Sequence, residues 1–264
     1  MKVLGKMENQ FFAYLQMRQL TTVRSGDMQV ALGLSAIQER KLLSRLSRAG
    51  MITRVRRGLY LVPERLPVSG AWSADPTVAL NTLMRELGGR YQICGLNAFN
   101  FYGWDEQVPM RIYAYNDKVF GEKELGSITV NLIKVDAKRL GAIRKVKRPD
   151  GVVAVYPSRE RALIDAVYDW SRFNSLPRAY RWIRKDLRDG KISAAMLANC
   201  ALRFGDVGTI RRLGALLEAE GIDETVLRSL EKSLKPTSAS IPFSPRKVKK
   251  GRFSRRWGVV MNEA

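Results

Sequence analysis

Residues 35–63 constrain the fold of this chain more than any other segment. Ser35 precedes Gln38 by three residues, the spacing at which a hydroxyl and a side-chain amide satisfy backbone N–H groups at a helix start. The sequence therefore predicts a helix that begins at Ser35 and ends at Gly50. The apolar side chains expected to cluster on its inner face are Ile37, Leu42, Leu43 and Leu46.

Two β-prone runs, 51–55 and 59–62, follow that helix, and Arg56-Arg57-Gly58 between them is typical of a hairpin with a cationic tip. Upstream, residues 24–32 can form a short helix, and Gly33 to Ser35 supply a tight turn. This order predicts a winged helix-turn-helix, whose second helix enters a DNA major groove. The alternative is a small helical bundle with a solvated basic face.

The predicted DNA contacts lie on the polar face of this helix and on the hairpin. Arg and Lys side chains can donate to guanine and Gln can pair with adenine, so we assign the helix residues to the groove. We assign the hairpin arginines to phosphates or a minor groove, where contacts give affinity and salt dependence without reading sequence. The residues are Ser35, Gln38, Arg40, Lys41, Ser44, Arg45, Arg56 and Arg57.

The charge of the whole chain supports a polyanionic partner. Its 46 Lys and Arg against 25 Asp and Glu give a net charge of +21, which attracts polyanions before any specific contact forms. Nucleic acid is the expected partner. An acidic membrane surface is the competing polyanion, but no apolar run reaches the roughly 18 residues that span a membrane. The N-terminus lacks the apolar core of a secretory signal, and Cys94 and Cys200 indicate no disulfide framework, so we expect a cytoplasmic protein.

Catalytic chemistry finds little support in the residues. The absence of histidine removes Ser-His-Asp and Cys-His catalysis and histidine-ligated zinc. Asp165 and Asp169 share an expected helix face, where two carboxylates can hold Mg²⁺ or do acid–base work. Arg161 and Arg172 are spaced to pair with them, which explains the pattern more simply. We expect no enzyme, no metal site and no cofactor.

A second cationic pair opens a later helix. Arg211 and Arg212 could face an anion, although Asp206 caps that helix and can balance their charge. Gly205 and Gly208 flank Asp206 without the longer glycine and lysine pattern of a phosphate loop. The sequence therefore gives no support for a nucleotide site.

The predicted fold class is α+β in two domains. Residues 1–66 form the winged helix-turn-helix, 67–74 a linker, and 75–264 a larger mixed domain that is mostly helical toward its end. In that domain, 235–256 is a basic extended segment and 257–262 a final strand. The tail side chains that could contact nucleic acid are Arg246, Lys247, Lys249, Lys250 and Arg252.

Apolar spacing and caps predict the remaining elements. Strands are expected at 111–115, 128–135 and 152–156, and a short buried helix within 91–104. Longer helices are expected at 7–20, 75–87, 157–171, 177–188, 193–203, 206–220 and 223–234.

Five segments in this order resemble the AbiEi family of antitoxins and transcriptional repressors from type IV toxin–antitoxin systems. They are RRGLYLVP at 56–63, CGLNAFNFYGWDEQVP at 94–109, YPSRERALIDAVYD at 156–169, RRLGALLE at 211–218 and WGVVMN at 257–262. The resemblance implies a winged helix-turn-helix joined to an antitoxin domain, within a phage-defence operon that also encodes a nucleotidyltransferase-like toxin. It further implies that the first domain binds operator repeats, while the second counters the toxin, often without a stable complex.

The expected function is thus a non-enzymatic repressor and antitoxin that autoregulates its promoter. Two copies on repeated operator sites can bind cooperatively. One alternative is an enzymatic, phosphotransferase-like antitoxin that modifies the toxin. Another is a general nucleic-acid-binding protein, in which Phe253 and Trp257 of the tail stack on bases.

Overall fold

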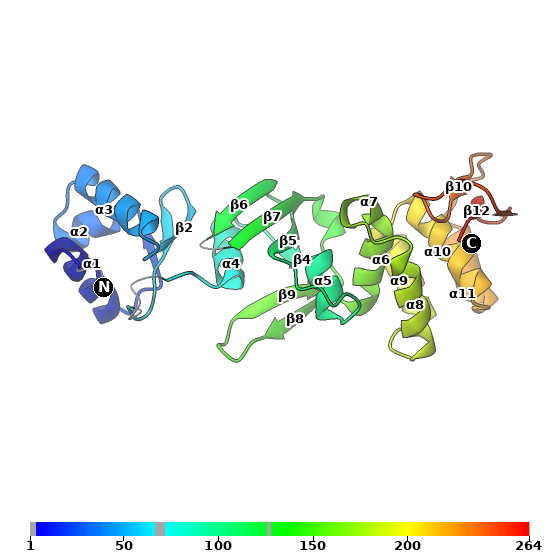
Figure 1. The fold of residues 1–264 in the computed structure, drawn as a ribbon, viewed down its shortest axis with the longest axis horizontal. Helices are drawn as coiled ribbons and strands as arrows, with labels where there is room; N and C mark the ends of the chain where they lie inside the picture. Colours follow the sequence, from blue (N-terminus) through cyan, green and yellow to red (C-terminus); the bar gives the residue numbers. More distant parts are fainter. Residues whose placement is uncertain (1–3, 67–71, 126–127, 264) are drawn as a thin grey trace.

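The computed structural model describes residues 4–66, 72–125 and 128–263. It has the expected α+β class, with helices and several small sheets. Figure 1 shows an elongated molecule in which the chain progresses from one end to the other. An N-terminal unit is followed by a mixed sheet, then by a helical layer, and the C-terminal strands lie at the far end.

The N-terminal unit, residues 4–66, combines three helices with a three-stranded sheet. The helices are α1 (Lys6–Met17), α2 (Asp27–Leu32) and α3 (Ala36–Arg48). The strands are β1 (Thr22–Arg24), β2 (Thr53–Arg56) and β3 (Leu59–Leu61), and β3 lies antiparallel between the other two. The helix predicted over 24–32 is wrong at its start, because residues up to Arg24 pair with β3 and the helix begins after Gly26.

The core of this unit confirms most of the predicted inner face of α3. Leu42, Leu43 and Leu46 are buried against Phe11 and Phe12 of α1, whose rings meet edge to face. Ile37 is 57% exposed, so its predicted inward position is wrong. The buried residue in that first turn is Glu39 instead. Its carboxylate accepts hydrogen bonds from backbone N–H groups at the start of α2.

The central part contains a mixed sheet and a separate hairpin. In the order β4-β5-β7-β6, β5 and β7 are parallel and the other neighbours antiparallel. The strands of the sheet are β4 (Tyr91–Ile93), β5 (Arg111–Asn116), β6 (Gly121–Leu125) and β7 (Ile128–Lys134). The hairpin consists of β8 (Ile143–Lys147) and β9 (Val153–Pro157). The other elements of this part are α4 (Pro76–Glu86), α5 (Leu96–Phe101) and a 3₁₀ turn, η1 (Ala137–Arg139).

The strands predicted at 111–115, 128–135 and 152–156 are confirmed, whereas β4, β6 and β8 were not predicted. The short helix expected within 91–104 is partly right, because β4 and Gly95 precede α5. Strand β6 has the sequence GEKEL and alternates between exposed and more shielded positions, whereas β8 has IRKVK and is exposed at every position except Val146. Their few apolar residues gave no strand signal.

The helical layer matches the predicted helices closely. Side chains of Ser158, Ser193, Asp206 and Asp223 accept hydrogen bonds from first-turn N–H groups of four of them. The predicted helix 157–171 is divided at Asp169 into α6 and α7. The helices are α6 (Arg159–Tyr168), α7 (Trp170–Phe173), α8 (Arg178–Arg188), α9 (Ala194–Phe204), α10 (Val207–Ala219) and α11 (Glu224–Glu231).

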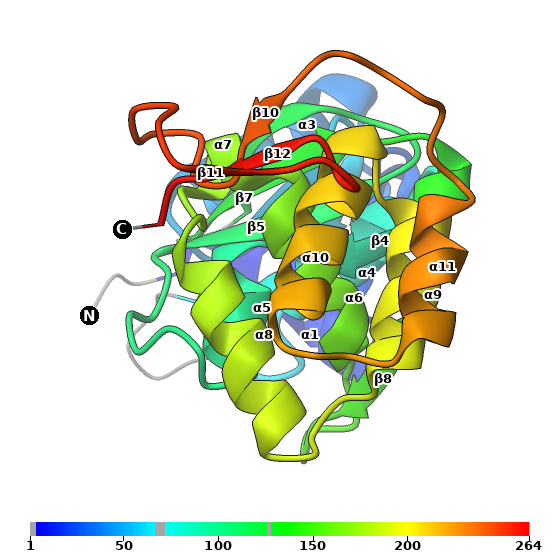
Figure 2. The same ribbon diagram turned by 90° about the vertical axis from the view of Figure 1, so that its right-hand side faces the viewer.

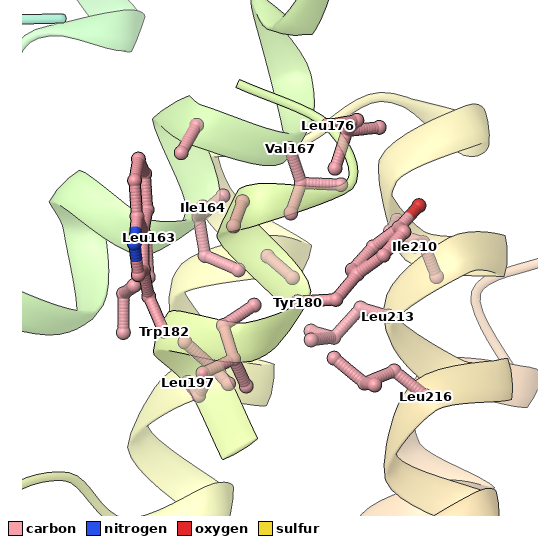
Figure 3. Close-up of a cluster of buried hydrophobic side chains, with 14 of the residues drawn as sticks. Leu163, Ile164, Val167, Leu176, Tyr180, Trp182, Leu197, Ile210, Leu213 and Leu216 are labelled. Atoms are coloured by element: carbon pink, nitrogen blue, oxygen red, sulfur yellow. The ribbon is translucent and has the colours of Figure 1, made fainter. Parts of the chain in front are cut away.

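A buried apolar cluster holds these helices together. Figure 3 shows Ile164 of α6 directed toward Tyr180 of α8, with Leu163 of α6 on the opposite side of the cluster and Leu197 of α9 and Leu213 of α10 completing it. Each of these five side chains is fully buried. The cluster makes α6 the central helix of the layer.

The tail folds back onto this layer instead of forming a free extended arm. Strand β12 (Val259–Met261) lies between β10 (Ile241–Pro242) and β11 (Arg252–Ser254). Seen from this end, the three strands lie beside α10 (Figure 2). The Asn262 side chain accepts from Ser244 N and donates to its carbonyl, which pins the chain before the basic loop. The final strand predicted at 257–262 is confirmed over Val259–Met261.

The N-terminal unit shares a hydrophobic cluster with the central part. Val55 and Leu59 of the β2–β3 hairpin join Leu80 and Leu83 of α4 in that cluster. Of the predicted linker 67–74, residues 67–71 lie outside the described residues, while Trp72 N donates to Gly50 O. Among the described residues, no helix is both long and apolar enough to cross a membrane.

Candidate nucleic-acid interface

The start of α3 is fixed by the predicted capping box. Ser35 Oγ accepts from Gln38 N at 3.3 Å, and Gln38 Oε1 accepts from Ser35 N at 2.8 Å. Both side chains are exposed but engaged in these bonds. They therefore set the direction of the helix, and their polar atoms are already partly satisfied.

The outer face of α3 forms a basic surface, which we call the α3 face. Arg40, Lys41, Ser44, Arg45 and Arg48 line one shallow hollow of about 630 Å³ together with Ala49. The structure thus brings four of the predicted contacts together and adds Arg48. Arg40, Lys41 and Arg48 are exposed and form no ion pair with any residue that the structure describes.

Arg45 differs from its neighbours on the α3 face. Its Nε donates to Glu8 Oε1 of α1 at 2.8 Å, and the Glu8 side chain is 16% exposed. A base or phosphate would have to compete with this carboxylate. Sequence spacing could not reveal the pair, because Glu8 is 37 residues away.

Glu39 fixes the angle between the two helices that precede the hairpin. Its carboxylate accepts from Gly26 N at 2.9 Å and from Met28 N at 3.0 Å, and the Gln29 amide donates to it at 2.9 Å. Gly26 has φ of 105° and precedes the first turn of α2. An acidic group at a helix N-terminus is favoured by the helix dipole, so one carboxylate couples α2 to α3.

The hairpin presents its arginines on one side. Residues 53–56 alternate between buried and exposed, so Arg54 and Arg56 face outward while Val55 is buried. Arg57 is also exposed, and Gly58 has φ of 78°, which permits the tight turn. Arg54 was not among the predicted contacts, although the alternation of TRVR indicates that it faces outward.

A carboxylate of α4 lies against this basic side. Arg24 donates to Glu86 through Nη1 at 2.8 Å and Nη2 at 2.5 Å, and Arg56 Nη1 lies 3.9 Å from Glu86 Oε1. The hydrogen bond from Arg24 lowers the pKa of the Glu86 carboxyl, and Arg56 adds to the effect. Arg24 and Glu86 were not predicted, because the contact joins residues 62 positions apart.

The basic tail residues divide into two groups. Lys247 Nζ donates to Glu263 O at 2.7 Å and Lys249 Nζ to Ser240 O at 2.6 Å, so both help to hold the loop. Arg246, Lys250 and Arg252 are exposed and have no ion pair within the described ranges. The strands of the tail lie at the opposite end of the molecule from α3 (Figure 1), so the two basic surfaces are separate.

The two aspartates considered for catalysis are held by arginines. Asp165 is 1% exposed and receives Arg161 Nε at 3.0 Å and Arg139 Nη2 at 2.8 Å. Burial raises the pKa of the Asp165 carboxyl, an effect that the two arginines oppose. Asp169 accepts from Arg172 Nε at 2.8 Å. The local ion pairing is confirmed, and residues 4–66, 72–125 and 128–263 contain no cluster of three or more metal-ligating side chains.

No family model matches the sequence, and no curated protein matches it. The fold is similar to that of a solved protein, the crystal structure of RV2827C protein from Mycobacterium tuberculosis. The TM-score is 0.59 at 17% sequence identity, and the match covers 98% of this chain and 92% of that chain. The likeness therefore concerns the fold, over nearly the whole length of both chains.

Proposed function

We propose that residues 4–66 form a winged helix-turn-helix that binds duplex DNA, and that the protein is a transcriptional repressor. The observation that carries this proposal is the α3 face, where Arg40, Lys41 and Arg48 are exposed and without ion pairs among the described residues. The opposite face of α3 is buried in the core of the unit. Burying an unpaired cation inside a protein is costly, so these side chains remain exposed to solvent. Their positive charge attracts a polyanion to this face of the helix.

The expected mechanism starts with capture of DNA by charge and ends with occlusion of a promoter. Helix α3 has 13 residues, about 20 Å, and its outer face can lie along a major groove. The hairpin arginines Arg54, Arg56 and Arg57 are then placed for phosphate contacts beside it. Arg40 and Lys41 are better candidates for base contacts than Arg45, because Glu8 holds Arg45.

The test is a binding titration with promoter DNA from upstream of the coding region. Arg40→Ala combined with Lys41→Ala should weaken binding about 10- to 100-fold, as expected for two lost base or phosphate contacts. The matched control is Lys145→Ala with Lys147→Ala on β8, an equal charge change on exposed residues, which should change affinity less than about twofold. Equal losses in both variants would contradict a specific role for α3.

We also propose, from the resemblance to AbiEi proteins alone, that residues 75–264 counter a nucleotidyltransferase-like toxin encoded beside this protein. Growth that is arrested by the toxin alone should be restored when the full chain is co-expressed with it. The Arg40→Ala/Lys41→Ala variant should restore growth as well. If the variant fails to restore growth, repression accounts for the rescue. Gel shifts with one and two operator repeats test cooperative self-association, which identical occupancy curves would contradict.

A further inference from the structure

A pocket of about 440 Å³ lies at the C-terminal end of the molecule, far from α3. It is lined by residues at the start of α10, by the chain that follows α11 and by the turn between β11 and β12. This volume falls within the range of small-molecule sites. Its lining side chains include Val207, Arg211, Lys235, Thr237, Phe253 and Arg255.

Arg211 gives this pocket a buried positive charge. The residue is 5% exposed, and its Nε donates to Trp257 O and its Nη2 to Ala239 O, both at 2.6 Å. Its Nη1 has no hydrogen-bond partner, and no carboxylate pairs with the guanidinium, among the residues that the structure describes. Burial, together with the neighbouring Arg212, lowers the pKa of Arg211. Its Nη2 also donates to Gly258 O, so backbone carbonyls surround the guanidinium and no carboxylate of the described residues neutralises it.

The position of Arg211 is built into the backbone. Gly258 has φ of 60°, and a Cβ there would overlap the Arg211 guanidinium, so glycine allows this close approach. Asp206, which the sequence suggested as the balancing charge, instead accepts from Thr209 N at 2.7 Å as the cap of α10. It forms no ion pair with Arg211 in the described structure.

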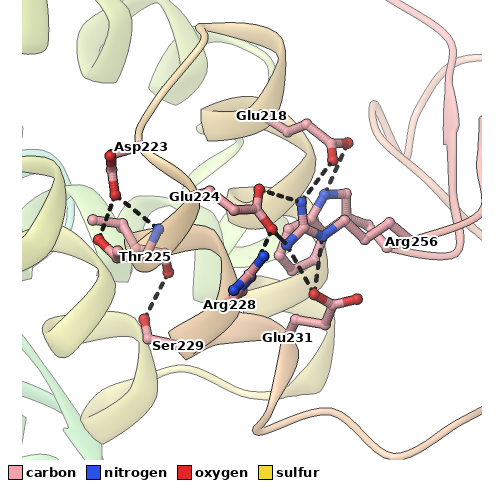
Figure 4. Close-up of polar contacts among 10 residues, drawn as sticks. Glu218, Asp223, Glu224, Thr225, Arg228, Ser229, Glu231 and Arg256 are labelled. Carbon is pink, nitrogen blue, oxygen red and sulfur yellow. Dashed lines mark hydrogen bonds and ion pairs between the residues drawn. The ribbon is translucent and has the colours of Figure 1, made fainter.

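The other charged side chains of the pocket differ in whether they have an ion-pair partner. Figure 4 shows Arg256 surrounded by Glu218, Glu224 and Glu231, with contacts of 3.3, 2.7 and 2.8 Å. The charge of Arg256 is therefore compensated, and Glu231, the acid that lines the pocket, is engaged by Arg256.

Two further cations lack such partners. Lys235 and Arg255 are exposed and form no ion pair within the described ranges. With Arg211 they leave the pocket positive.

An aromatic ring and a hydroxyl complete the lining. Phe253 is 47% exposed and Val207 is 58% exposed, so both present apolar surface to a ligand. Aromatic side chains in such positions stack on bases. Thr237 Oγ1 accepts from Ala239 N at 3.1 Å, which leaves its O–H free to donate.

We infer that this pocket binds a phosphate monoester attached to an aromatic base. The phosphate is received by Arg211, Arg255 and Lys235, and the base stacks on Phe253. This is the shared chemistry of a nucleoside 5′-monophosphate and of the 5′-phosphorylated end of a nucleic acid. The site does not depend on DNA binding by α3. It has no glycine-rich phosphate loop, and its residues come together through the folding of the tail.

Calorimetric titration of the full chain with AMP and with adenosine tests the site. AMP should bind at least about tenfold more tightly than adenosine, because charged hydrogen bonds to the phosphate are lost in the nucleoside. Arg255→Gln and Phe253→Ala, both on exposed side chains, should each weaken AMP binding about five- to tenfold. The matched control is Arg246→Gln, an exposed tail arginine outside the pocket lining, which should leave AMP binding unchanged.

Two further titrations distinguish the sources of the ligand. A single-stranded trinucleotide with a 5′-phosphate is compared with the same trinucleotide ending in a 5′-hydroxyl. Tighter binding of the phosphorylated form than of AMP assigns the pocket to nucleic-acid ends, and the reverse assigns it to free nucleotides. The inference is overturned if phosphate improves neither ligand, or if Arg246→Gln loses as much affinity as Arg255→Gln.

Discussion

Arg24 and Arg56 show how the function of a side chain can depend on a partner that the sequence hides. Both lie on the basic side of the N-terminal unit, and both reach Glu86 of α4. Arg24 is 59% exposed and Glu86 is 19% exposed, so the carboxylate is the more shielded partner. A phosphate that approaches the hairpin must compete with Glu86 for these two arginines.

Under the proposed function, Glu86→Gln should therefore tighten DNA binding. The variant keeps the shape of the side chain but removes the charge that attracts Arg24 and Arg56. We expect about a two- to fivefold gain in affinity at low salt, which shrinks as salt screens the exposed charges. Fluorescence anisotropy with promoter DNA at about 50 and about 300 mM salt measures both effects. The Debye length falls from roughly 14 to roughly 6 Å between these two concentrations.

The control for this variant is Glu106→Gln, because Glu106 is exposed and forms no ion pair with a described residue. It changes the net charge by the same amount. Equal gains in the two variants would show that total charge, and not release of the two arginines, controls affinity.

The sequence predicted the roles of single residues where those roles depend on local spacing in the chain. The capping box of Ser35 and Gln38 follows from three-residue spacing, and the exposed Arg40 and Lys41 follow from the helical period. The buried Glu39 could not be predicted, because its partners belong to another helix.

Helix α10 illustrates what packing demands of an element. Trp257 is 1% exposed, and a Cβ at Gly214 would overlap its indole ring. Glu218 Oε2 accepts from Trp257 Nε1 at 3.0 Å and fixes the orientation of the ring. The tryptophan that was considered for base stacking is therefore part of the contact between the tail and α10, and that role for Trp257 is wrong.

Gly214→Ala should destabilise the protein although alanine favours helices. Overpacking against Trp257 should lower the free energy of unfolding by about 1 to 3 kcal/mol. Gly208→Ala in the same helix is the control, since its Cβ would crowd only the end of the Arg212 side chain, with Nη1 at 3.2 Å. Urea unfolding should place Gly208→Ala within about 1 kcal/mol of wild type. A neutral Gly214→Ala variant would mean that the tail moves aside at little cost.

Elements with a side-chain cap were predictable, and polar strands were not. Asp75 and Ser158 open helices where the sequence placed them, because a cap and an apolar period mark the same boundary. Strands β6 and β8 consist largely of charged residues and owe their pairing to β7 and β9. Such strands are defined by their neighbours, which single-sequence patterns do not contain.

Charge dominates the behaviour of the molecule as a whole. At a net charge of +21, each carboxylate that becomes neutral in acid adds to the repulsion among 46 basic residues. Several carboxyls have a lowered pKa in the fold, so the native state binds fewer protons on them than the unfolded chain. Their stabilisation is present above the ordinary carboxyl pKa and is lost as pH falls through the native pKa. They are Asp75, Glu86, Asp189, Asp223 and Glu224.

Asp75→Asn isolates one of these groups. Burial disfavours the Asp75 carboxylate, but hydrogen bonds from Arg148, Val78 and Thr77 outweigh it and lower the pKa. Asparagine retains a capping oxygen for α4 and loses the ion pair with Arg148. The variant should be less stable than wild type by up to about 1 kcal/mol at pH 7, and the gap should close as pH falls below about 4.

Urea unfolding at several pH values measures this gap. Asp136→Asn is the control, because Asp136 caps the 3₁₀ turn through Lys138 N but forms no ion pair with a described residue. Its change in stability is the baseline for replacing a capping carboxylate that has no arginine partner, and the Asp75→Asn gap is compared with it at each pH. A constant gap for Asp75→Asn would show that the cap, and not the charge pair, carries its contribution.

The two expected domains meet through a shared apolar cluster at the hairpin. Val55 and Leu59 face α4, while Arg54 and Arg56 on the same strands' outer side face solvent and Glu86. The sequence predicted the order of helix, turn, helix and hairpin, but not this contact, because Leu80 and Leu83 follow the hairpin by some distance in the chain.

The carboxylate of Glu39 has a consequence for how mutational scans of this protein are interpreted. It points away from the α3 face and toward the start of α2, where it holds two N–H groups. Under the proposed DNA binding, its replacement by alanine would let the α3 face tilt, and a survey of mutants defective in repression would return it beside the arginines. A footprint drawn from such a survey would then include a side chain that is only 2% exposed and lies inside the protein.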